Sequence, residues 1–435
     1  MAEVELKRFL DLFEGLRPSE DWSFKWLSQK ETSYLTHSYH QYPAKFIPQL
    51  ASRLIQEHSR EGEWVLDPFM GSGTTLVEAR LLRRPSVGID VNPVAHLIAE
   101  AKTHPLPPPE LTKYAHFVKE EFYARVGPSL FSPANVSSVS NHSWNERLTH
   151  WFPEKVLVEL KIIQSIIEQL PKPYYTFFAC ALSGSLKALS FWHNRSIKPM
   201  RKPDKRIPPV ETIYFRKVQK MLKANAEYWQ ALQSHDGFSV ITQPLLGDAR
   251  ALPIPNEQVH LIVTSPPYVT SYEYADLHQL SALWFGWMED RKKFREPFIG
   301  RSLSKSTAFH SLYSDIADAI VGQIYQKSPS KANEVATYFA DMAASFQEMY
   351  RVLLPKGIAA IVIGNTEFLG VKVSNAEAFM EQLYSIGFTP KKVILREIPS
   401  KTLPQARDKR TGKFTTGTKA DFSAYPVEYI LIIQK

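Results

Sequence analysis

Two short apolar runs that each end in an aspartate constrain the fold of this chain more than any other feature. The first run, residues 63–67, leads into a turn rich in proline and glycine at 68–73 and then into a helix-like stretch. The second run, residues 86–90, is followed by Asn92-Pro93 and by another helix-like stretch. Strands and helices that alternate in this order form a parallel sheet with helices packed on its faces.

The same alternation continues in the second half of the chain. The elements expected there are strands at 260–264 and 357–364, a helix at 333–353, a helix at 374–387 that begins with a capping box of Ser374 and Glu377, and strands at 391–398 and 427–433. The last two strands are close enough in the chain to pair as a hairpin. The pattern therefore predicts an α/β fold with a doubly wound, mostly parallel sheet and a terminal antiparallel hairpin.

Two stretches interrupt the alternation. Residues 105–243 have helical periodicity and predict an inserted, mainly helical subdomain, in which one helix face is formed by Val156, Leu160, Ile163, Ile167 and Leu170. Residues 289–331 are rich in serine, lysine and arginine without a clear period, which predicts a long irregular loop. We expect a sheet domain in two parts, 1–104 and 244–435, with the helical subdomain between them.

Composition excludes several classes of protein. With 44% hydrophobic and 22% charged residues, the chain is in the range of globular proteins. No apolar run approaches the roughly 18 residues of a membrane span, and the N-terminus lacks the apolar core of a signal peptide, so a soluble, cytoplasmic protein is expected. The single cysteine, Cys180, excludes an internal disulfide. His37, His40, His193 and His278 are scattered, and no metal site is expected.

The first candidate site is the string Asp67-Pro-Phe-Met-Gly-Ser-Gly-Thr-Thr75. A glycine turn between a strand and a helix is expected to present backbone N–H groups and the positive helix end to a cofactor. Asp90, about 20 residues further on, is spaced as a carboxylate that meets ribose hydroxyls. The string is not a P-loop, because no Gly-Lys-Ser/Thr follows, and Leu76 stands where a dinucleotide fingerprint has its third glycine.

The second candidate site is Thr264-Ser-Pro-Pro-Tyr268, directly after a predicted strand. Two consecutive prolines remove two N–H donors, so this turn offers acceptors beside an aromatic ring. Such a surface suits an exocyclic amino group, with the Pro266 carbonyl and the Ser265 hydroxyl as acceptors and the Tyr268 ring stacked on the base.

Two further strings accompany these sites. Leu246-Gly-Asp-Ala-Arg250 places Asp248 at another strand tip, where its carboxylate could accept from an adenine amine. An aromatic and basic string at 39–48 precedes the first strand, and it suits either cofactor contact or simple packing on the sheet.

Together these residues show a family resemblance. DPFMGSGTT, GIDVNP, GDAR and TSPPY resemble the cofactor and catalytic motifs of the amino-methylating DNA methyltransferases, and YHQYPAKFIP is similar to their N-terminal cofactor motif. The resemblance implies a seven-stranded, Rossmann-like methyltransferase sheet and S-adenosylmethionine as cofactor, with Phe46, Asp67 and the glycine turn at its methionine end, Asp90 at its ribose and Asp248 at its adenine. The cofactor residues expected are Tyr42, Lys45, Phe46, Asp67, Phe69, Gly71, Ser72, Gly73, Thr74, Asp90, Asp248 and Ala249.

The resemblance also bears on the target base. Serine before Pro-Pro-Tyr resembles the enzymes that methylate cytosine N4, whereas the adenine N6 group more often has aspartate or asparagine there. The expected catalytic residues are Ser265, Pro266, Pro267 and Tyr268, which would act on a flipped base by direct in-line transfer. Carbon-5 methylation is disfavoured, because it needs a cysteine nucleophile and Cys180 lies in an apolar helical stretch.

Three alternatives remain open: methylation of adenine N6, methylation of an RNA amine, and a catalytically idle DNA-binding subunit. The expected partner is double-stranded DNA, and a cognate restriction endonuclease is a candidate partner in a restriction–modification or phage-defence system. The expected place of action is the prokaryotic nucleoid.

Two basic stretches are candidates for DNA contact, in a chain with a formal net charge of +8. The first, residues 193–217, mixes cations with prolines and aromatic residues, as phosphate contacts with some base stacking require. Its proposed contact residues are Arg195, Lys198, Arg201, Lys202, Lys205 and Arg206. The second, residues 401–419, suits a surface hairpin as well as a groove contact.

Overall fold

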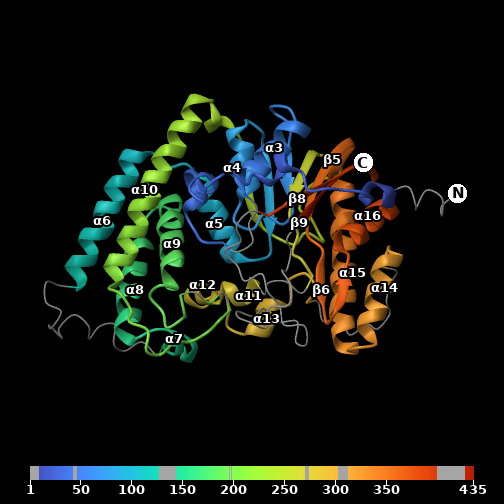
Figure 1. The fold of residues 1–435 in the computed structure, drawn as a ribbon. Helices are drawn as coiled ribbons and strands as arrows, with labels where there is room; N and C mark the ends of the chain where they lie inside the picture. The colour runs from blue at the N-terminus through green and yellow to red at the C-terminus, as the bar shows by residue number, and fades with distance from the viewer. Residues whose placement is uncertain are drawn as a thin grey trace.

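A computed structural model describes residues 9–42, 47–126, 144–194, 196, 198–269, 274–301, 312–398 and 427–435 (Figure 1). Its centre is a seven-stranded sheet. The strand order is β3 (Thr242–Leu246), β2 (Ser86–Asp90), β1 (Val65–Asp67), β4 (Val259–Thr264), β5 (Leu353–Ile363), β9 (Val427–Gln434) and β8 (Thr389–Glu397). Strand β9 runs antiparallel to both of its neighbours, and the other pairs are parallel. The predicted doubly wound sheet with a terminal antiparallel hairpin is confirmed.

Successive side chains of each central strand point to opposite faces of this sheet. In β4, Leu261 and Val263 pack on one side with Leu54 of α3, whereas Ile262 packs on the other side with Phe346 of α15. Both faces are therefore buried, which explains why the strands read as continuous apolar runs rather than as alternating ones.

Helices cover both faces (Figure 1). One face is covered by α2 (Glu20–Ser23), α3 (Pro48–His58) and α4 (Thr74–Leu81), and the other by α14 (Asp315–Tyr325), α15 (Pro329–Val352) and α16 (Asn375–Ile386). Short helices α11 (Tyr274–Leu277), α12 (Gln279–Trp284) and α13 (Arg291–Arg295) follow β4. The remaining short elements are η1 (Asp11–Phe13), η2 (Glu31–Ser33), η3 (Leu35–Ser38), η4 (Gly237–Ser239) and the hairpin β6 (Thr366–Phe368) with β7 (Val371–Val373).

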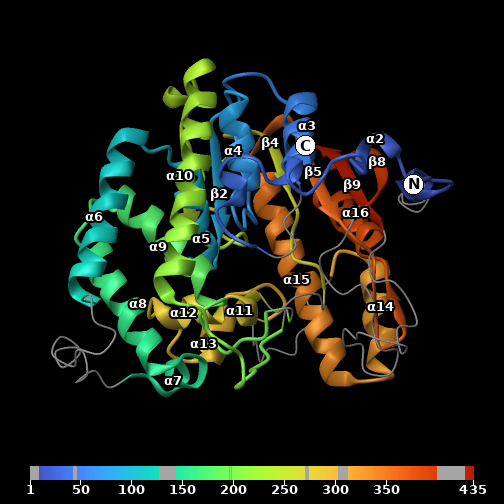
Figure 2. The same cartoon turned by 60° about the vertical axis from the view of Figure 1, so that its left-hand side comes forward.

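A helical block stands at the β3 edge of the sheet (Figures 1 and 2). It consists of α6 (Pro108–Val126), α7 (Glu146–Trp151), α8 (Glu154–Ile167), α9 (Lys172–Leu186) and α10 (Val210–Ser234). The block shares one hydrophobic cluster with α5 (Pro93–Thr103) and α12, so it packs on these two helices beside the sheet. The five apolar residues predicted to form one face, Val156 to Leu170, are all buried. No described helix has the length and apolar character needed to cross a bilayer.

The prediction of an irregular loop at 289–331 is wrong for a large part of that range. Helix α14 lies within it and begins at Ser314, whose hydroxyl accepts a hydrogen bond from the Ala317 N–H at 3.0 Å. Ala317, Ile320 and Ile324 are buried against the sheet layer. This capping serine and its apolar spacing were the available helix signal, and the polar residues around them obscured it.

The capping box predicted at Ser374 is also corrected. Helix α16 does begin after Ser374, but the serine side chain makes no capping bond. Instead Asn365 caps the helix, because its Oδ1 accepts from the Ala376 N–H at 2.9 Å while its amide donates to Glu377 at 2.7 Å. The cap therefore comes from the chain after β5, which local sequence could not show.

Candidate active site

A cavity opens at the carboxyl ends of the parallel strands, where the strand order reverses between β1 and β4. This is the place where open α/β sheets bind ligands. Most of the predicted site residues line it, namely Tyr42, Asp67, Phe69, Gly71, Ser72, Thr74, Asp90, Asp248, Ala249, Ser265, Pro267 and Tyr268. Gly73 and Pro266 adjoin these residues but do not line the cavity. Lys45 and Phe46 lie outside the described residues.

Asp67 joins the glycine turn to the second predicted site. Its carboxylate accepts from the hydroxyls of Thr264 and Thr75, each at 2.7 Å, and from the Phe69 N–H at 3.1 Å. Because the group is buried, its pKa is raised to about 6, and these hydrogen bonds limit the rise. Asp67 thus holds the tips of β1 and β4 together at the cavity wall.

Asp90 braces the same turn from β2. Its two carboxylate oxygens accept from the N–H groups of Gly71 at 3.0 Å and Asn92 at 2.8 Å, and burial raises its pKa to about 6. The Gly73 N–H donates to the Met70 carbonyl at 2.7 Å. The expectation that the turn presents free N–H groups is therefore wrong for Gly71 and Gly73, whose donors are used within the fold.

The two glycines are still required by the turn. Gly71 and Gly73 have φ values of 48° and 72°, in the left-handed region that favours glycine. A Cβ on Gly73 would lie 2.9 Å from the Cβ of Ala99 on α5, so a side chain there would also push the helix away. Their function at the cavity is to shape the backbone.

A buried charge network beneath the turn was not predicted. Lys102 on α5 is 1% exposed, and its ammonium donates to the Ser72 carbonyl at 2.6 Å. Nearby Glu78 accepts from Tyr34 at 2.6 Å and lies 2.8 Å from the His37 ring nitrogen Nε2, with its pKa raised to about 7 by burial. In the sequence Lys102 reads as an ordinary lysine near a helix end, so no signal distinguished it.

The Ser-Pro-Pro-Tyr turn is held from three sides. The Ser265 hydroxyl donates to the Val362 carbonyl at 3.1 Å, and the Pro267 carbonyl accepts from the Tyr338 hydroxyl at 2.9 Å. The Tyr268 hydroxyl donates to Glu428 on β9 at 2.9 Å. Ser265 lines the cavity wall, where the lone pairs of its hydroxyl oxygen can accept a hydrogen bond.

Tyr268 is held in place by residues of the terminal hairpin. Glu428 also pairs with Arg396 of β8 at 3.1 Å, and the Arg396 side chain is only 3% exposed. The ring of Tyr268 lies so close to Gly364 that a Cβ there would be 2.9 Å from ring atom Cε2. Glu428, Arg396 and Gly364 were not singled out in the sequence, because they follow the motif by about a hundred residues or more and their role depends on strand pairing.

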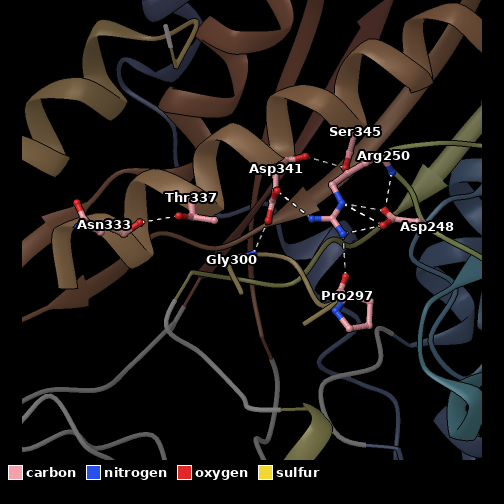
Figure 3. Close-up of polar contacts among 8 residues, drawn as sticks. All are labelled: Asp248, Arg250, Pro297, Gly300, Asn333, Thr337, Asp341 and Ser345. Atoms are coloured by element: carbon pink, nitrogen blue, oxygen red, sulfur yellow. Dashed lines mark hydrogen bonds and ion pairs between the residues drawn. The ribbon is translucent and has the colours of Figure 1, made fainter. Parts of the chain in front are cut away.

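Asp248 lies at the cavity, as predicted, but it is not a free acceptor. Arg250 donates to both of its carboxylate oxygens at 2.6 to 3.1 Å and also to Asp341 at 2.9 Å (Figure 3). The segment 295–301 and Tyr338 complete this wall of the cavity. Arg250 belongs to the GDAR string of the sequence, so its pairing with Asp248 could have been predicted from their spacing.

Tyr42, from the aromatic string at 39–48, packs on the opposite wall. Its ring lies 6.2 Å from the ring of Tyr274 and 4.8 Å from that of His278. Burial lowers the pKa of His278 to about 4, so the imidazole is neutral, and its Nδ1 faces the Asn92 amide at 2.8 Å. Asn92 in turn caps α5, accepting from the Val94 N–H at 3.0 Å.

The basic stretch proposed for DNA contact contains side chains of two kinds. The Lys205 ammonium donates to the carbonyls of Lys187, Ser190 and Trp192 at 3.0, 2.6 and 2.9 Å. These bonds use all three of its donors, and burial lowers its pKa to about 8. Lys205 therefore ties down the chain after α9, which argues against the predicted phosphate contact.

The other members of the stretch are more accessible. Lys198, Lys202 and Arg206 are exposed, and the Arg201 guanidinium is exposed but donates to the His150 carbonyl at 2.7 Å. Arg195 and the second stretch, 401–419, lie outside the described residues. Within the described part of the chain, no group of three or more His, Cys, Asp or Glu side chains is arranged to hold a metal ion.

Comparison with known proteins adds independent information. A family model described as DNA methylase matches residues 10–101. The chain is 27% identical over 396 residues to the type II methyltransferase M.MvaI of Kocuria varians, covering 86% of each protein. It is 25% identical over 424 residues to the type II methyltransferase M.BsoBI of Geobacillus stearothermophilus, covering 82% of this chain and 79% of that protein. The crystal structure of the putative DNA modification methylase TTHA0409 of Thermus thermophilus with S-adenosylmethionine aligns with 43% of this chain and 53% of its own, at 19% identity and a TM-score of 0.22.

Proposed function

Since the chain belongs to the S-adenosylmethionine-dependent DNA methyltransferases that act on amino groups, we propose that it methylates the exocyclic N4 of cytosine in a specific duplex DNA sequence. The observation that supports this most is the state of Ser265. Its hydroxyl donates to the Val362 carbonyl, and the lone pairs of its oxygen can accept a hydrogen bond at the cavity wall. An acceptor beside an aromatic ring is what an amino group on a flat base requires.

The cavity residues fit the cofactor. Thr74 lines the cavity at the start of α4, and its buried hydroxyl oxygen has no hydrogen-bond partner among the described residues. It would contact the methionine end together with Ser72, while Asp90 would accept from the ribose hydroxyls. Asp248 would lie beside the adenine, with its carboxylate held by Arg250. When bound, the cofactor supplies an electrophilic methyl group on a sulfonium sulfur.

The protein's own contribution is to orient the amine. The nitrogen lone pair of an exocyclic amine is delocalised into the ring, which makes the nitrogen a poor nucleophile. Hydrogen bonds from its two N–H groups to the Ser265 hydroxyl and the Pro266 carbonyl would favour a pyramidal nitrogen whose lone pair points into the cavity. The Tyr268 ring, fixed by Glu428 and Gly364, would stack on the flipped base.

Contact with duplex DNA is assigned to the side of the molecule where the cavity opens. The basic stretch between α9 and α10 lies at the same end as α11 and α13 in both views (Figures 1 and 2). We assign phosphate contacts to the exposed Lys198, Lys202 and Arg206, and target recognition to the inserted helical subdomain. A companion restriction endonuclease, and action on the prokaryotic chromosome, complete the proposal.

The test is to methylate DNA with the purified protein and isotopically labelled S-adenosylmethionine, and then to separate the digested nucleosides by mass spectrometry. Labelled N4-methylcytosine is the expected product. Labelled N6-methyladenine would keep the enzyme class and overturn the choice of base. Cofactor binding without any labelled deoxynucleoside would redirect the search to RNA or to an idle DNA-binding subunit.

Two variants distinguish the proposed base-binding part of the cavity from its proposed cofactor-binding part. Tyr268→Ala is expected to leave cofactor affinity nearly intact and to abolish transfer, because the ring would contact the base and not the cofactor. Asp90→Ala is expected to weaken cofactor binding. If Tyr268→Ala removed cofactor binding instead, the assignment of the Ser-Pro-Pro-Tyr turn to the base would be wrong.

A further inference from the structure

Arg250 connects three segments that are far apart in the chain. Its guanidinium lies between the carboxylates of Asp248 and Asp341, and it also donates to the Pro297 carbonyl at 3.0 Å (Figure 3). The Arg250 side chain is 18% exposed and the Asp341 side chain 12% exposed, so both charges are largely removed from water. Planar, two-sided pairing of this kind fixes geometry as well as charge.

Asp341 extends the connection to a second point. One of its carboxylate oxygens accepts from Arg250, and the other accepts from the Gly300 N–H at 2.8 Å. The segment 297–301 is thus anchored at Pro297 by Arg250 and at Gly300 by Asp341. Because this segment and Asp248 both line the cavity, a single arginine sets the separation of two parts of its wall.

We propose that Arg250 is a positioning residue that holds the segment 297–301 against Asp248 and so fixes the width of the cofactor end of the cavity. The identity of the ligand rests on the proposed function, whereas the connection itself does not. Loss of the guanidinium is expected to weaken cofactor binding and to leave the rate at saturating cofactor little changed, because the Ser-Pro-Pro-Tyr turn is held by other residues.

The chain offers a matched control in Arg351, which is on α15 like Asp341. Arg351 pairs with Glu348 at 2.7 Å and donates to the carbonyls of Leu252 and Ile254 at 3.0 and 2.8 Å. It makes the same kind of arginine–carboxylate–carbonyl connection, but neither it nor its partners line the cavity. Arg351→Met should therefore destabilise the fold by losing a connection of the same kind, while the cavity stays unchanged.

The experiment compares Arg250→Met, Arg250→Lys and Arg351→Met in two assays. The first is hydrogen exchange of peptides covering 295–301 in the cofactor-free protein. The second is the Kd for S-adenosylmethionine by titration calorimetry. Arg250→Met is expected to speed exchange at Gly300 and to raise the Kd roughly ten-fold, the equivalent of one charge-assisted hydrogen bond. Arg250→Lys should recover part of both effects, and Arg351→Met should change neither.

A second variant guards against a folding failure. Asp341→Asn keeps an acceptor for the Gly300 N–H but removes the charge that Arg250 pairs with, so it should show the same two effects at a smaller size. If the Arg250 variants match Arg351→Met in both assays, the proposal is overturned. If the wild-type protein bound no S-adenosylmethionine, the proposed function would fail, and the exchange data would still decide whether Arg250 positions the segment.

Discussion

Gly364→Ala gives a direct test of how Tyr268 is held. Gly364 follows β5, and its φ is not in the left-handed region, so alanine is compatible with the backbone. The new Cβ would lie 2.9 Å from Cε2 of Tyr268, whereas ordinary contact begins at 3.4 Å. The ring must therefore move by about 0.5 Å, a substantial fraction of the roughly 1 Å misplacement that can cost a hundred-fold in rate.

The ring has little freedom to move, because its hydroxyl is bonded to Glu428 and Glu428 is paired with the buried Arg396. We expect kcat for DNA methylation to fall by roughly ten-fold and the free energy of unfolding to fall by about 1–3 kcal/mol, as in other overpacked sites. The Kd for cofactor should change little. Steady-state kinetics, calorimetric titration and urea unfolding measure the three quantities.

Gly237→Ala is the matched control. Gly237 also lacks a left-handed φ, and a Cβ there would lie 2.6 Å from Leu232, far from the cavity in the connection between α10 and β3. It should lower stability to a similar extent without changing kcat. Equal losses of kcat in the two variants, or an unchanged kcat in Gly364→Ala, would show that the contact with Gly364 does not position the catalytic ring.

Three further predictions concern Tyr268, Asp67 and Lys205. Tyr268→Phe keeps the ring and loses the bond to Glu428, so kcat should fall several-fold while Tyr268→Ala abolishes transfer; equal loss in both would place the function in the hydroxyl. Burial raises the pKa of Asp67 from 3.8 to about 6, so protonation stabilises the fold as the pH falls from 6 to 4. In urea unfolding over this range, the unfolding free energy of the wild type should rise by about 2–3 kcal/mol relative to that of Asp67→Asn. A difference that stays constant with pH would contradict the raised pKa. Lys205→Met should lower the unfolding free energy by about 1–3 kcal/mol and leave DNA affinity unchanged. Lys202→Met should weaken DNA binding and reduce its salt dependence, as measured by fluorescence anisotropy. The reverse pattern would show that Lys205 contacts DNA.

Local sequence was sufficient for the order of the sheet elements and for the position of the cavity. Strand ends, glycine turns and capping residues are decided by neighbours within a few positions, so the runs ending in Asp67 and Asp90 could be placed directly. The carboxyl ends of parallel strands then meet at one edge of the sheet, which brings Asp67, Asp90, Asp248 and Ser265 to one cavity. That these four residues meet at one cavity therefore follows from their positions at strand ends.

Only the tertiary structure decided which donors and acceptors of the candidate site residues remain available to a ligand. In the sequence, Lys205 is one of several cations in the basic stretch. In the structure, its ammonium donates to three carbonyls at the end of α9 and just after this helix, so Lys205 has a structural role. Asp248 reads as a free acceptor until Arg250 joins it to Asp341, 91 positions further along the chain. Hydrogen bonds and ion pairs between distant segments form once packing has brought the segments together, and the sequence gives the residues but not their partners.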